Sequence, residues 1–262
     1  MQDLMDEAGG LLRHEPIDRR VRASLEGRTI ADSSRAILVW EPRRISPFYA
    51  VPDEDLAAEL SPAPATDDHT PGLLHPGIPF SVHSAEGQAL TIAGRAGAGY
   101  RLADDDLDGY VVLDFDAFDW LEEDEPIAGH PRSPYHRVDV RRSLRTVRIE
   151  LEGEVIAETT GARLLCETSL PMRFYIPRED VRADLHPSPS RSYCPYKGEA
   201  SWWSVEGHVD LGWTYAQPMP ELTVIAGMVA FWDELVDVVV DGEPRERPRS
   251  VFSEVLLEEF GV

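Results

Sequence analysis

Lysine and cysteine are scarce in this chain of 262 residues, and long apolar runs are absent. Lys197 is the only lysine among 25 basic residues, so the others are all arginine. Two cysteines, Cys166 and Cys194, are too few for a disulfide framework, and a lone bridge is unusual in a reducing compartment. We therefore expect two free thiols, with Cys166 buried as a small hydrophobic residue of a strand.

No apolar stretch approaches the roughly 20 residues that a membrane-spanning helix needs. The first residues include Asp3, Asp6 and Glu7, where a signal peptide would carry basic residues. Positively charged residues are also scarce relative to acidic ones. The formal net charge is -23, and the sequence contains no stripe of basic residues. Phosphate backbones and anionic lipid surfaces repel such a chain. We expect a cytoplasmic protein that binds neither nucleic acid nor membranes.

Motifs for metals and phosphate groups are missing as well. The sequence has no paired Cys-x-x-Cys turns, and Cys166 and Cys194 lack the close spacing of zinc ligands, so we expect no structural zinc. The glycine-rich segment 93–99 follows a predicted strand but opens no helix, unlike a phosphate cradle. No cofactor is indicated.

What the sequence does contain is an internal repeat. Residues 21–31 and 147–157 share seven of eleven residues at a constant offset, 147 − 21 = 126, and Glu41 recurs as Glu167 at the same offset. Later matches include Gly109 with Gly227 and Asp119 with Asp237. We predict an N-terminal extension at 1–20, a first repeat at 21–135, a second repeat at 136–250 and a C-terminal helical tail at 251–262.

Within each repeat, apolar residues recur with the period of two that is typical of strands. In the second repeat, 147–151 and 155–158 flank the Glu152-Gly153 turn and predict a half-buried hairpin. Further strands are expected at 162–167 and 172–176, with hairpins formed by 200–205 with 209–215 and by 228–232 with 236–240. A short helix is predicted to start after Pro177, and helix competes with strand over 221–232. The chain should be mostly β, with antiparallel sheets and few short helices.

The densest chemical cluster is the segment 194–203, which contains Lys197. In a chain rich in arginine, a single lysine suggests a position where a compact ammonium is needed. Strand alternation would set Lys197 and Glu199 on one face and Trp202 on the other, with Trp202 and Trp203 on opposite faces and a bulge at Gly198. One indole could then line a groove with Trp213, Tyr215 and Tyr175, although strand aromatics commonly belong to a core.

Several roles are open to these residues. Lys197, Cys194 and Glu199 are the catalytic candidates, and Cys194 could act as a nucleophile that the nearby ammonium activates. Tyr196 could contact a ligand, and Arg178 could hold an anionic group. The nearest histidines in sequence, His186 and His208, are expected in exposed loops. Because Glu167 recurs as Glu41, a structural hydrogen bond explains it better than catalysis.

Segments 177–181, 194–205 and 213–215 resemble motifs of the bacterial family known as domain of unknown function 427, sometimes labelled nucleotidyltransferase-like. Segments 114–118 and 130–139 resemble the tandem form found in actinobacteria. The resemblance implies two tandem β-tent-like domains, each with two twisted antiparallel sheets meeting at an angle. It implies no established activity.

The first repeat departs from this pattern. Where the second has Cys194 to Trp203, the first has Leu74 to Phe80, and Ala93 to Gly97 offers no counterpart of Trp213 and Tyr215. The sequence therefore predicts one small-molecule binding or catalytic site, in the second repeat and centred on Lys197. The alternatives are a nucleotidyltransferase-type enzyme and a non-catalytic interaction scaffold.

Overall fold

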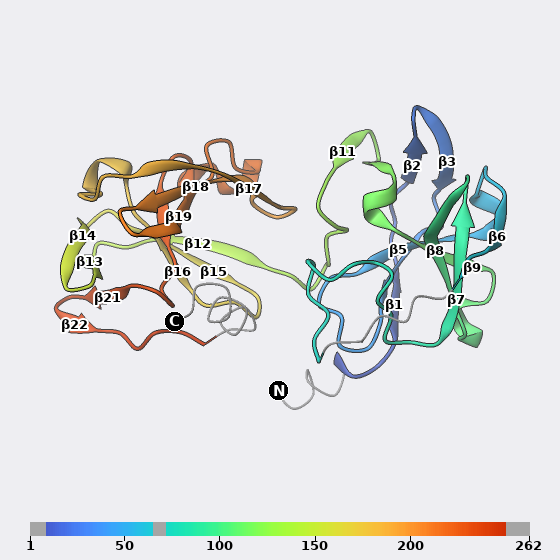
Figure 1. Ribbon diagram of the computed structural model, residues 1–262, viewed down its shortest axis with the longest axis horizontal. Helices are drawn as coiled ribbons and strands as arrows, with labels where there is room; N and C mark the ends of the chain where they lie inside the picture. The colour runs from blue at the N-terminus through green and yellow to red at the C-terminus, as the bar shows by residue number, and fades with distance from the viewer. Residues whose placement is uncertain (1–8, 65–71, 250–262) are drawn as a thin grey trace. The chain divides into compact units, whose positions relative to one another are not determined.

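The computed structural model describes residues 9–64 and 72–249. These residues form two compact units, Met1–Ser133 and Pro134–Val262, which Figure 1 shows in blue to green and in green to red. Strands dominate and short 3-10 helices connect them, which confirms the predicted fold class. No helix of the described residues is both long and apolar enough to cross a bilayer. The predicted helical tail at 251–262 lies outside these residues.

The first unit contains two antiparallel sheets. One has seven strands in the order β1-β4-β5-β9-β8-β7-β6, and the other has four in the order β11-β10-β2-β3. The elements are β1 (Arg13–Pro16), β2 (Val21–Leu25), β3 (Arg28–Ser33), β4 (Ile37–Trp40), β5 (Phe48–Pro52), η1 (Asp53–Asp55), β6 (Leu60–Pro62), β7 (Gly87–Ile92), β8 (Arg95–Leu102), η2 (Asp105–Leu107), β9 (Tyr110–Leu113), η3 (Phe115–Ala117), β10 (Asp119–Glu122) and β11 (Glu125–Ile127).

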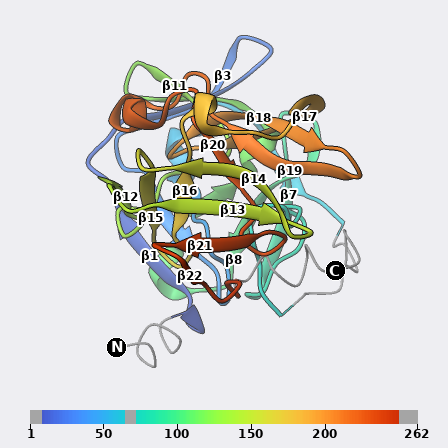
Figure 2. The same ribbon diagram turned by 90° about the vertical axis from the view of Figure 1, so that its left-hand side faces the viewer.

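The second unit repeats this topology. Its sheets have the orders β12-β15-β16, β17-β18-β19-β20 and β14-β13-β21-β22, and an antiparallel bridge between Ile176 and Val229 joins the first two. Figure 2 shows the β14-β13-β21-β22 sheet at the front. The elements are β12 (Val138–Arg142), β13 (Val147–Leu151), β14 (Glu154–Thr159), β15 (Arg163–Glu167), β16 (Arg173–Tyr175), η4 (Arg178–Asp180), β17 (His186–Cys194), β18 (Gly198–Val205), β19 (His208–Thr214), η5 (Pro220–Ile225), β20 (Val229–Phe231), β21 (Asp237–Val240) and β22 (Glu243–Pro244).

The predicted hairpin of β13 and β14 forms as its alternation requires. Val147, Ile149 and Leu151 are buried and the charged residues between them are not, while Gly153 turns the chain at φ 84. A left-handed backbone at this point favours glycine, because other residues would bring their Cβ too close to the following carbonyl. The residues of this segment alone, its alternating strand and its turn glycine, are therefore sufficient to predict the hairpin.

Both units also repeat a turn anchored by an aspartate. After Pro52 and Pro177, the 3-10 helices η1 and η4 begin, as the fixed φ of proline favours. Asp55 Oδ2 accepts a hydrogen bond from Ser33 Oγ at 2.7 Å, and Asp180 Oδ2 accepts one from Thr159 Oγ1 at 2.5 Å. The recurrence of these acidic residues is structural.

The predicted hairpin of 228–232 with 236–240 was wrong. Strands β20 and β21 both form, but β20 pairs with β19 and β21 with β13 and β22, so they are not a hairpin. A turn at Trp232, whose carbonyl accepts from the amides of Leu235 and Val236, carries the chain from one sheet to the other. In the segment 221–232, helix and strand both occur, as η5 and then β20.

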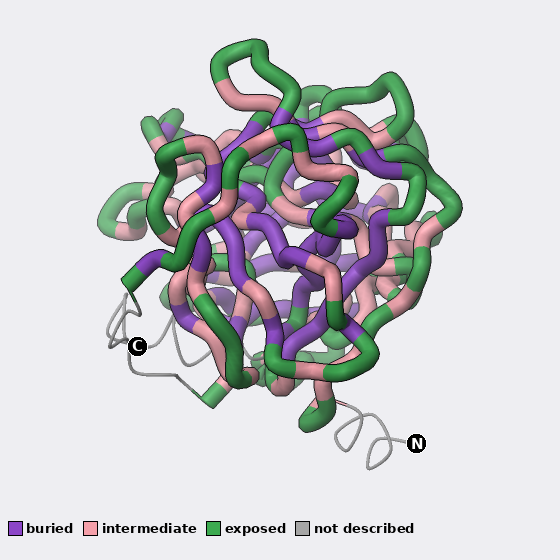
Figure 3. Tube along the Cα trace, turned by 90° about the vertical axis from the view of Figure 1, so that its right-hand side faces the viewer, coloured by how far each residue is buried: buried purple, intermediate pink, exposed green. Residues whose placement is uncertain are grey.

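Apolar side chains fill each unit between and behind its sheets. In the first unit, buried strand interiors alternate with exposed loops, as Figure 3 shows in purple and green. The second unit has two clusters of buried residues, one around Ile149 and Phe231 and one around Tyr175, Trp213 and Tyr215. Cys166 was predicted to be buried but is exposed on β15, since the apolar residue of that strand that packs inward is Leu165. Both cysteines are free, as predicted.

Candidate functional site

Glu167, the last residue of β15, is the centre of the polar groups near Lys197. Its side chain is only 6% exposed, and its two carboxylate oxygens bind groups from two distant segments. His136 Nε2 lies 3.0 Å from Oε1, and Lys197 Nζ donates a hydrogen bond to Oε2. Three ionisable side chains thus meet at one buried point.

Lys197 does not lie on a strand, which corrects the predicted face alternation. It stands in the turn between β17 and β18, where its amide donates to the carbonyl of Cys194 at 3.1 Å and its carbonyl accepts from Met219 at 3.0 Å. Gly198 follows with φ 100, a left-handed conformation that glycine adopts without a Cβ clash. The turn holds both sides of the Lys197 backbone and leaves its side chain 11% exposed.

The His136 ring stacks on the ring of Tyr196, with centroids 4.1 Å apart and planes 23° from parallel. His136 precedes β12, and Tyr196 belongs to the same turn as Lys197. The imidazole is 19% exposed on its side chain, so the site reaches the surface there. His136 was not among the sequence candidates, because the site was sought near Lys197 along the chain and His136 is 61 positions away, 197 − 136.

The charge of Glu167 is stabilised by its partners. Burial alone would raise the pKa of this carboxyl, but the hydrogen bond with His136 and the charge and hydrogen bond of Lys197 together lower it. Glu167 therefore remains a carboxylate well below neutral pH. The predicted hydrogen bonding of this recurrent glutamate is confirmed, and its partner is the lysine that the sequence singled out.

The other polar candidates are spread around this point. Cys194 is half-buried at the end of β17, and its Cα pairs with that of Gly198 across the turn. Glu199 is exposed at the start of β18. Arg178 lies over the ring of Trp203 at 5.8 Å from its centroid. Glu199 and Arg178 are not among the groups that bind Glu167.

The aromatic candidates pack mainly into the core. Tyr175, Trp213 and Tyr215 are buried, and Trp213 Nε1 donates to the Tyr175 hydroxyl at 3.2 Å. Burial raises the pKa of both tyrosines, so their hydroxyls stay protonated. Trp202 packs with this cluster, while Trp203 packs on the opposite face with the cluster around Ile149, which confirms that the two indoles do not share a face.

Trp232 is an aromatic residue that the sequence analysis did not select. Its ring stacks on Trp202 at 5.8 Å and lies 4.9 Å from Trp213, so three indoles form one group. Arg173 lies over two of these rings, at 5.3 Å from Trp232 and 6.0 Å from Trp213. Trp232 directly follows β20, in a segment where helix and strand were both predicted, so the sequence gave no sign that it joins this group.

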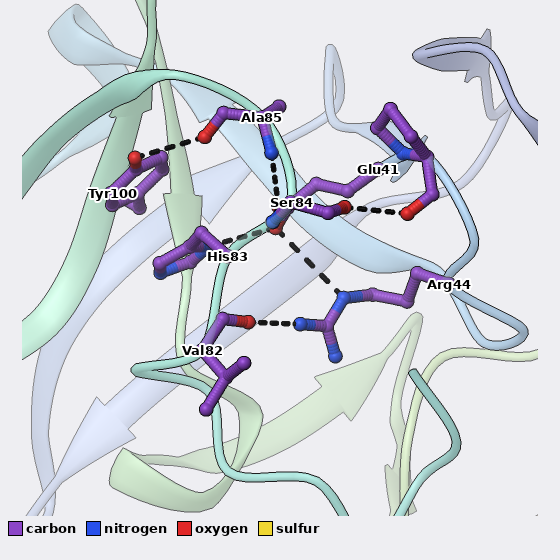
Figure 4. A network of polar contacts seen from close by, with 8 residues as sticks. Glu41, Arg44, Val82, His83, Ser84, Ala85 and Tyr100 are labelled. Carbon is purple, nitrogen blue, oxygen red and sulfur yellow. Dashed lines mark hydrogen bonds and ion pairs between the residues drawn. The ribbon is translucent and has the colours of Figure 1, made fainter. Parts of the chain in front are cut away.

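The first unit holds a similar but differently built network around Glu41, shown in Figure 4. Glu41 accepts from His83 Nδ1 at 2.7 Å and from the amides of Ser84 and Ala85 at 2.7 and 3.2 Å. Arg44 Nε lies 3.8 Å from the same carboxylate. The His83 ring stacks on Tyr100 at 3.5 Å. Burial opposes the charge of Glu41, yet His83, Arg44 and the Ser84 amide lower its pKa.

Strand registers show which residues of the two units correspond. Ala89 pairs with Tyr100 as Trp202 pairs with Trp213, both at an offset of 202 − 89 = 113. Extending this offset places Ser84 at the position of Lys197 and His83 at that of Tyr196. The alignment of Leu74–Phe80 with Cys194–Trp203 was therefore wrong, because it ignored the loop before β7, and Trp213 does have an aromatic counterpart.

A family model described as a domain of unknown function (DUF427) matches residues 13–71 and 139–242. The chain belongs to this family. The DUF427 match includes Glu41, Glu167 and Lys197, and it leaves out His83 and His136. A search of curated proteins found no significant match. In the described part of this DUF427 member, no three or more His, Cys, Asp or Glu residues gather in a way that could hold a metal ion.

Proposed function

We propose that the second unit binds a small molecule carrying an anionic group, at a site centred on Lys197 with His136, Glu167 and Tyr196. The observation that carries the proposal is how Glu167 is held. Among the described residues its partners are two ionisable side chains, His136 and Lys197, whereas two main-chain amides join His83 in binding Glu41 at the corresponding position. Side chains can turn from one partner to another, but amides fixed in a backbone cannot.

The charges of the site favour an anionic ligand group. The Lys197 ammonium has three donors and the structure gives it one carboxylate partner, Glu167. When His136 is protonated, the three side chains sum to one positive charge, which a single anionic group would neutralise. A ligand carboxylate or phosphate could then share the ammonium with Glu167, and Tyr196 would contact the rest of the molecule.

The catalytic form of the proposal uses Cys194. The thiol is half-buried within three residues of Lys197, at the mouth of the same turn. The thiolate is the nucleophilic form of cysteine. Glu199 is exposed beside the turn and would contact a ligand only at its outer edge.

Ligand-dependent stabilisation measured by thermal unfolding tests the proposal. Inorganic phosphate, benzoate and ATP with and without Mg²⁺ would each be added to the full chain, to Lys197→Arg and to Arg44→Lys. Binding to the folded state alone raises the unfolding temperature. Because a guanidinium cannot reproduce the compact ammonium, Lys197→Arg should lose the shift that phosphate or benzoate produces.

Arg44→Lys is the matched control, because it changes the basic partner of the other buried glutamate. It should keep the ligand-dependent shift even though the first unit becomes less stable. Equal loss of the shift in both variants, or no shift with any probe, contradicts the proposal and favours the interaction scaffold. A shift that requires both ATP and Mg²⁺ would favour the nucleotidyltransferase alternative instead.

A further inference from the structure

A cavity of about 170 Å³ lies in the second unit, away from the turn that holds Lys197. It is bordered by the residues before β16, the turn between β20 and β21, strand β21 and the residues that follow β22. Its walls include Met172, Val236 and Val238, which are apolar, together with Asp233, Arg245 and Arg247. The walls thus combine apolar and charged side chains.

In the first unit, two aromatic rings occupy the corresponding positions. Trp120 pairs with Ala23 as Val238 pairs with Ile149, and the same offset of 118 makes Asp233 the counterpart of Phe115. Phe115 and Trp120 stack at 5.3 Å with planes only 4° apart. In the second unit a carboxyl and a smaller side chain replace them, and both line the cavity. The space is therefore specific to the second unit.

Asp233 is a buried carboxyl to which no side chain or amide of residues 9–64 and 72–249 donates a hydrogen bond. It is 7% exposed, and its nearest charged contact is Arg173 Nη1 at 3.8 Å, beyond hydrogen-bond distance. Arg173 instead binds Glu234 through Nη2 at 2.6 Å. Within the described residues, Arg173 Nη1 and Glu234 Oε2 also have no hydrogen-bond partner although both are buried. Buried polar groups normally have partners, so this cluster is incomplete.

The arginines around the cavity are engaged elsewhere. Arg247 pairs with Asp237 at 3.2 Å and donates to the Glu234 carbonyl at 3.4 Å. Arg245 lies over the Phe174 ring at 5.3 Å from its centroid. Two buried carboxyl groups, Asp233 and Glu234, thus lie beside one buried guanidinium, that of Arg173, and a positive group in the cavity would complete the pairing of Asp233.

We propose that this cavity binds a small organic cation, a primary ammonium or guanidinium group on a short apolar body, with Asp233 as its counter-ion. The ammonium would donate to the Asp233 carboxylate, and the apolar body would lie against Met172, Val236 and Val238. A buried charge is stable only when it is paired and hydrogen-bonded, and the cation supplies both.

The charges near Asp233 give the binding a pH dependence. Burial raises the pKa of Asp233 to about 7, Arg173 and Arg245 act against this, and Glu234 adds to it. Arg247 and Glu246 also line the cavity, and Arg247 is paired with Asp237. A cation binds the carboxylate form, so its affinity should rise about tenfold from pH 6 to pH 8 as Asp233 loses its proton.

Titration of the full chain with n-butylammonium, followed by NMR, tests the proposal. Butyrate and 1-butanol are the anionic and neutral probes of the same shape. We expect n-butylammonium to bind and the other two not to bind. Asp233→Asn should weaken binding at least tenfold at pH 8, and Val238→Trp, which restores the ring of the first unit, should abolish it.

Glu246→Gln is the matched control, because Glu246 is another carboxylate of the cavity wall but is exposed to solvent, whereas Asp233 is buried. It should change the affinity less than twofold, and Lys197→Arg should leave it unchanged, which separates this site from the proposed anion site. If a variant does not fold, the pH dependence of the unmodified chain still decides. Tighter binding at pH 6 than at pH 8, or preferential binding of butyrate, overturns the proposal.

Discussion

The two units bury a glutamate at equivalent positions and satisfy it in different ways. Glu41 in the first unit accepts from two main-chain amides and an imidazole, with Arg44 nearby. Glu167 in the second unit binds the side chains of His136 and Lys197, and no main-chain amide of the described residues donates to it. At the same strand end, main-chain amides thus take part in the network of one unit, while the network of the other is formed by side chains.

The histidines that bind the two glutamates come from different segments of their units. In the first unit His83 comes from the loop before β7, and in the second unit His136 comes from the segment before β12. At the position of His83 the second unit has Tyr196, which stacks on His136 instead of binding the carboxylate. Duplication therefore kept the carboxylate and replaced its surroundings.

The largest difference should appear when each carboxylate is neutralised. Glu41→Gln leaves Arg44 buried without an opposite charge, and we expect a loss of about 3–5 kcal/mol in the unfolding free energy of the first unit. Glu167→Gln should cost about 1–2 kcal/mol, because Lys197 and His136 lie nearer the surface and can turn towards water. Urea unfolding followed by hydrogen exchange in peptides of each unit measures both.

Each substitution serves as the control for the other, since the two units need not unfold together. An equal or greater loss for Glu167→Gln would show that the second network is as rigid as the first. It would also remove the main support for a ligand site at Lys197.

The second comparison concerns Asp233 and its counterpart Phe115. An aspartate has a pKa of about 3.9 when unfolded, and that of Asp233 is about 7 when folded. The folded state then binds more protons between these values, so stability falls as pH rises from about 4 to 7. Asp233→Asn should therefore raise the unfolding free energy by about 4 kcal/mol at pH 8 and by about 1.5 kcal/mol at pH 5.

Chemical unfolding at pH 5, 6, 7 and 8 measures this dependence. Asp119→Asn is the control, because Asp119 is an exposed carboxylate in the corresponding strand of the first unit. Parallel stability profiles for Asp233→Asn and the unmodified chain would mean that Asp233 is hydrated and ionised throughout.

The smallest effects should be the same in both units. Ser33→Ala and Thr159→Ala each remove a hydroxyl that donates to an aspartate, Asp55 or Asp180, and accepts from a nearby amide. We expect each to cost about 1–2 kcal/mol, measured by urea unfolding. A difference larger than this between the two would show that the shared framework has diverged as well as the sites.

The sequence predicted the framework better than the site, for a physical reason. Alternation and turn glycines are local, so the hairpins around Gly153 and Gly207 follow from nearby residues. The pairing of β20 and β21 depends on partners far along the chain, and their nearness in sequence wrongly suggested a hairpin.

Within the site, composition located Lys197 but could not identify its partners. Glu167 was recognised only through its repeat, and His136 lies in a segment whose role depends on how β12 approaches β15. The aromatic residues were chosen as a pocket wall, yet Tyr175 and Tyr215 are buried. Side-chain type does not distinguish a ring in a core from a ring in a groove, since both are apolar surfaces.

Each unit joins its beginning to its end, because β2 pairs with β10 and β13 pairs with β21. A growing chain therefore cannot complete the four-stranded sheet of the first unit until Ile127 has left the ribosome. Contacts of such wide sequence separation form slowly, and domains commonly fold as units in the order of their synthesis. The first unit can thus close before the strands of the second are made, which limits exchange of similar strands between two halves of related sequence.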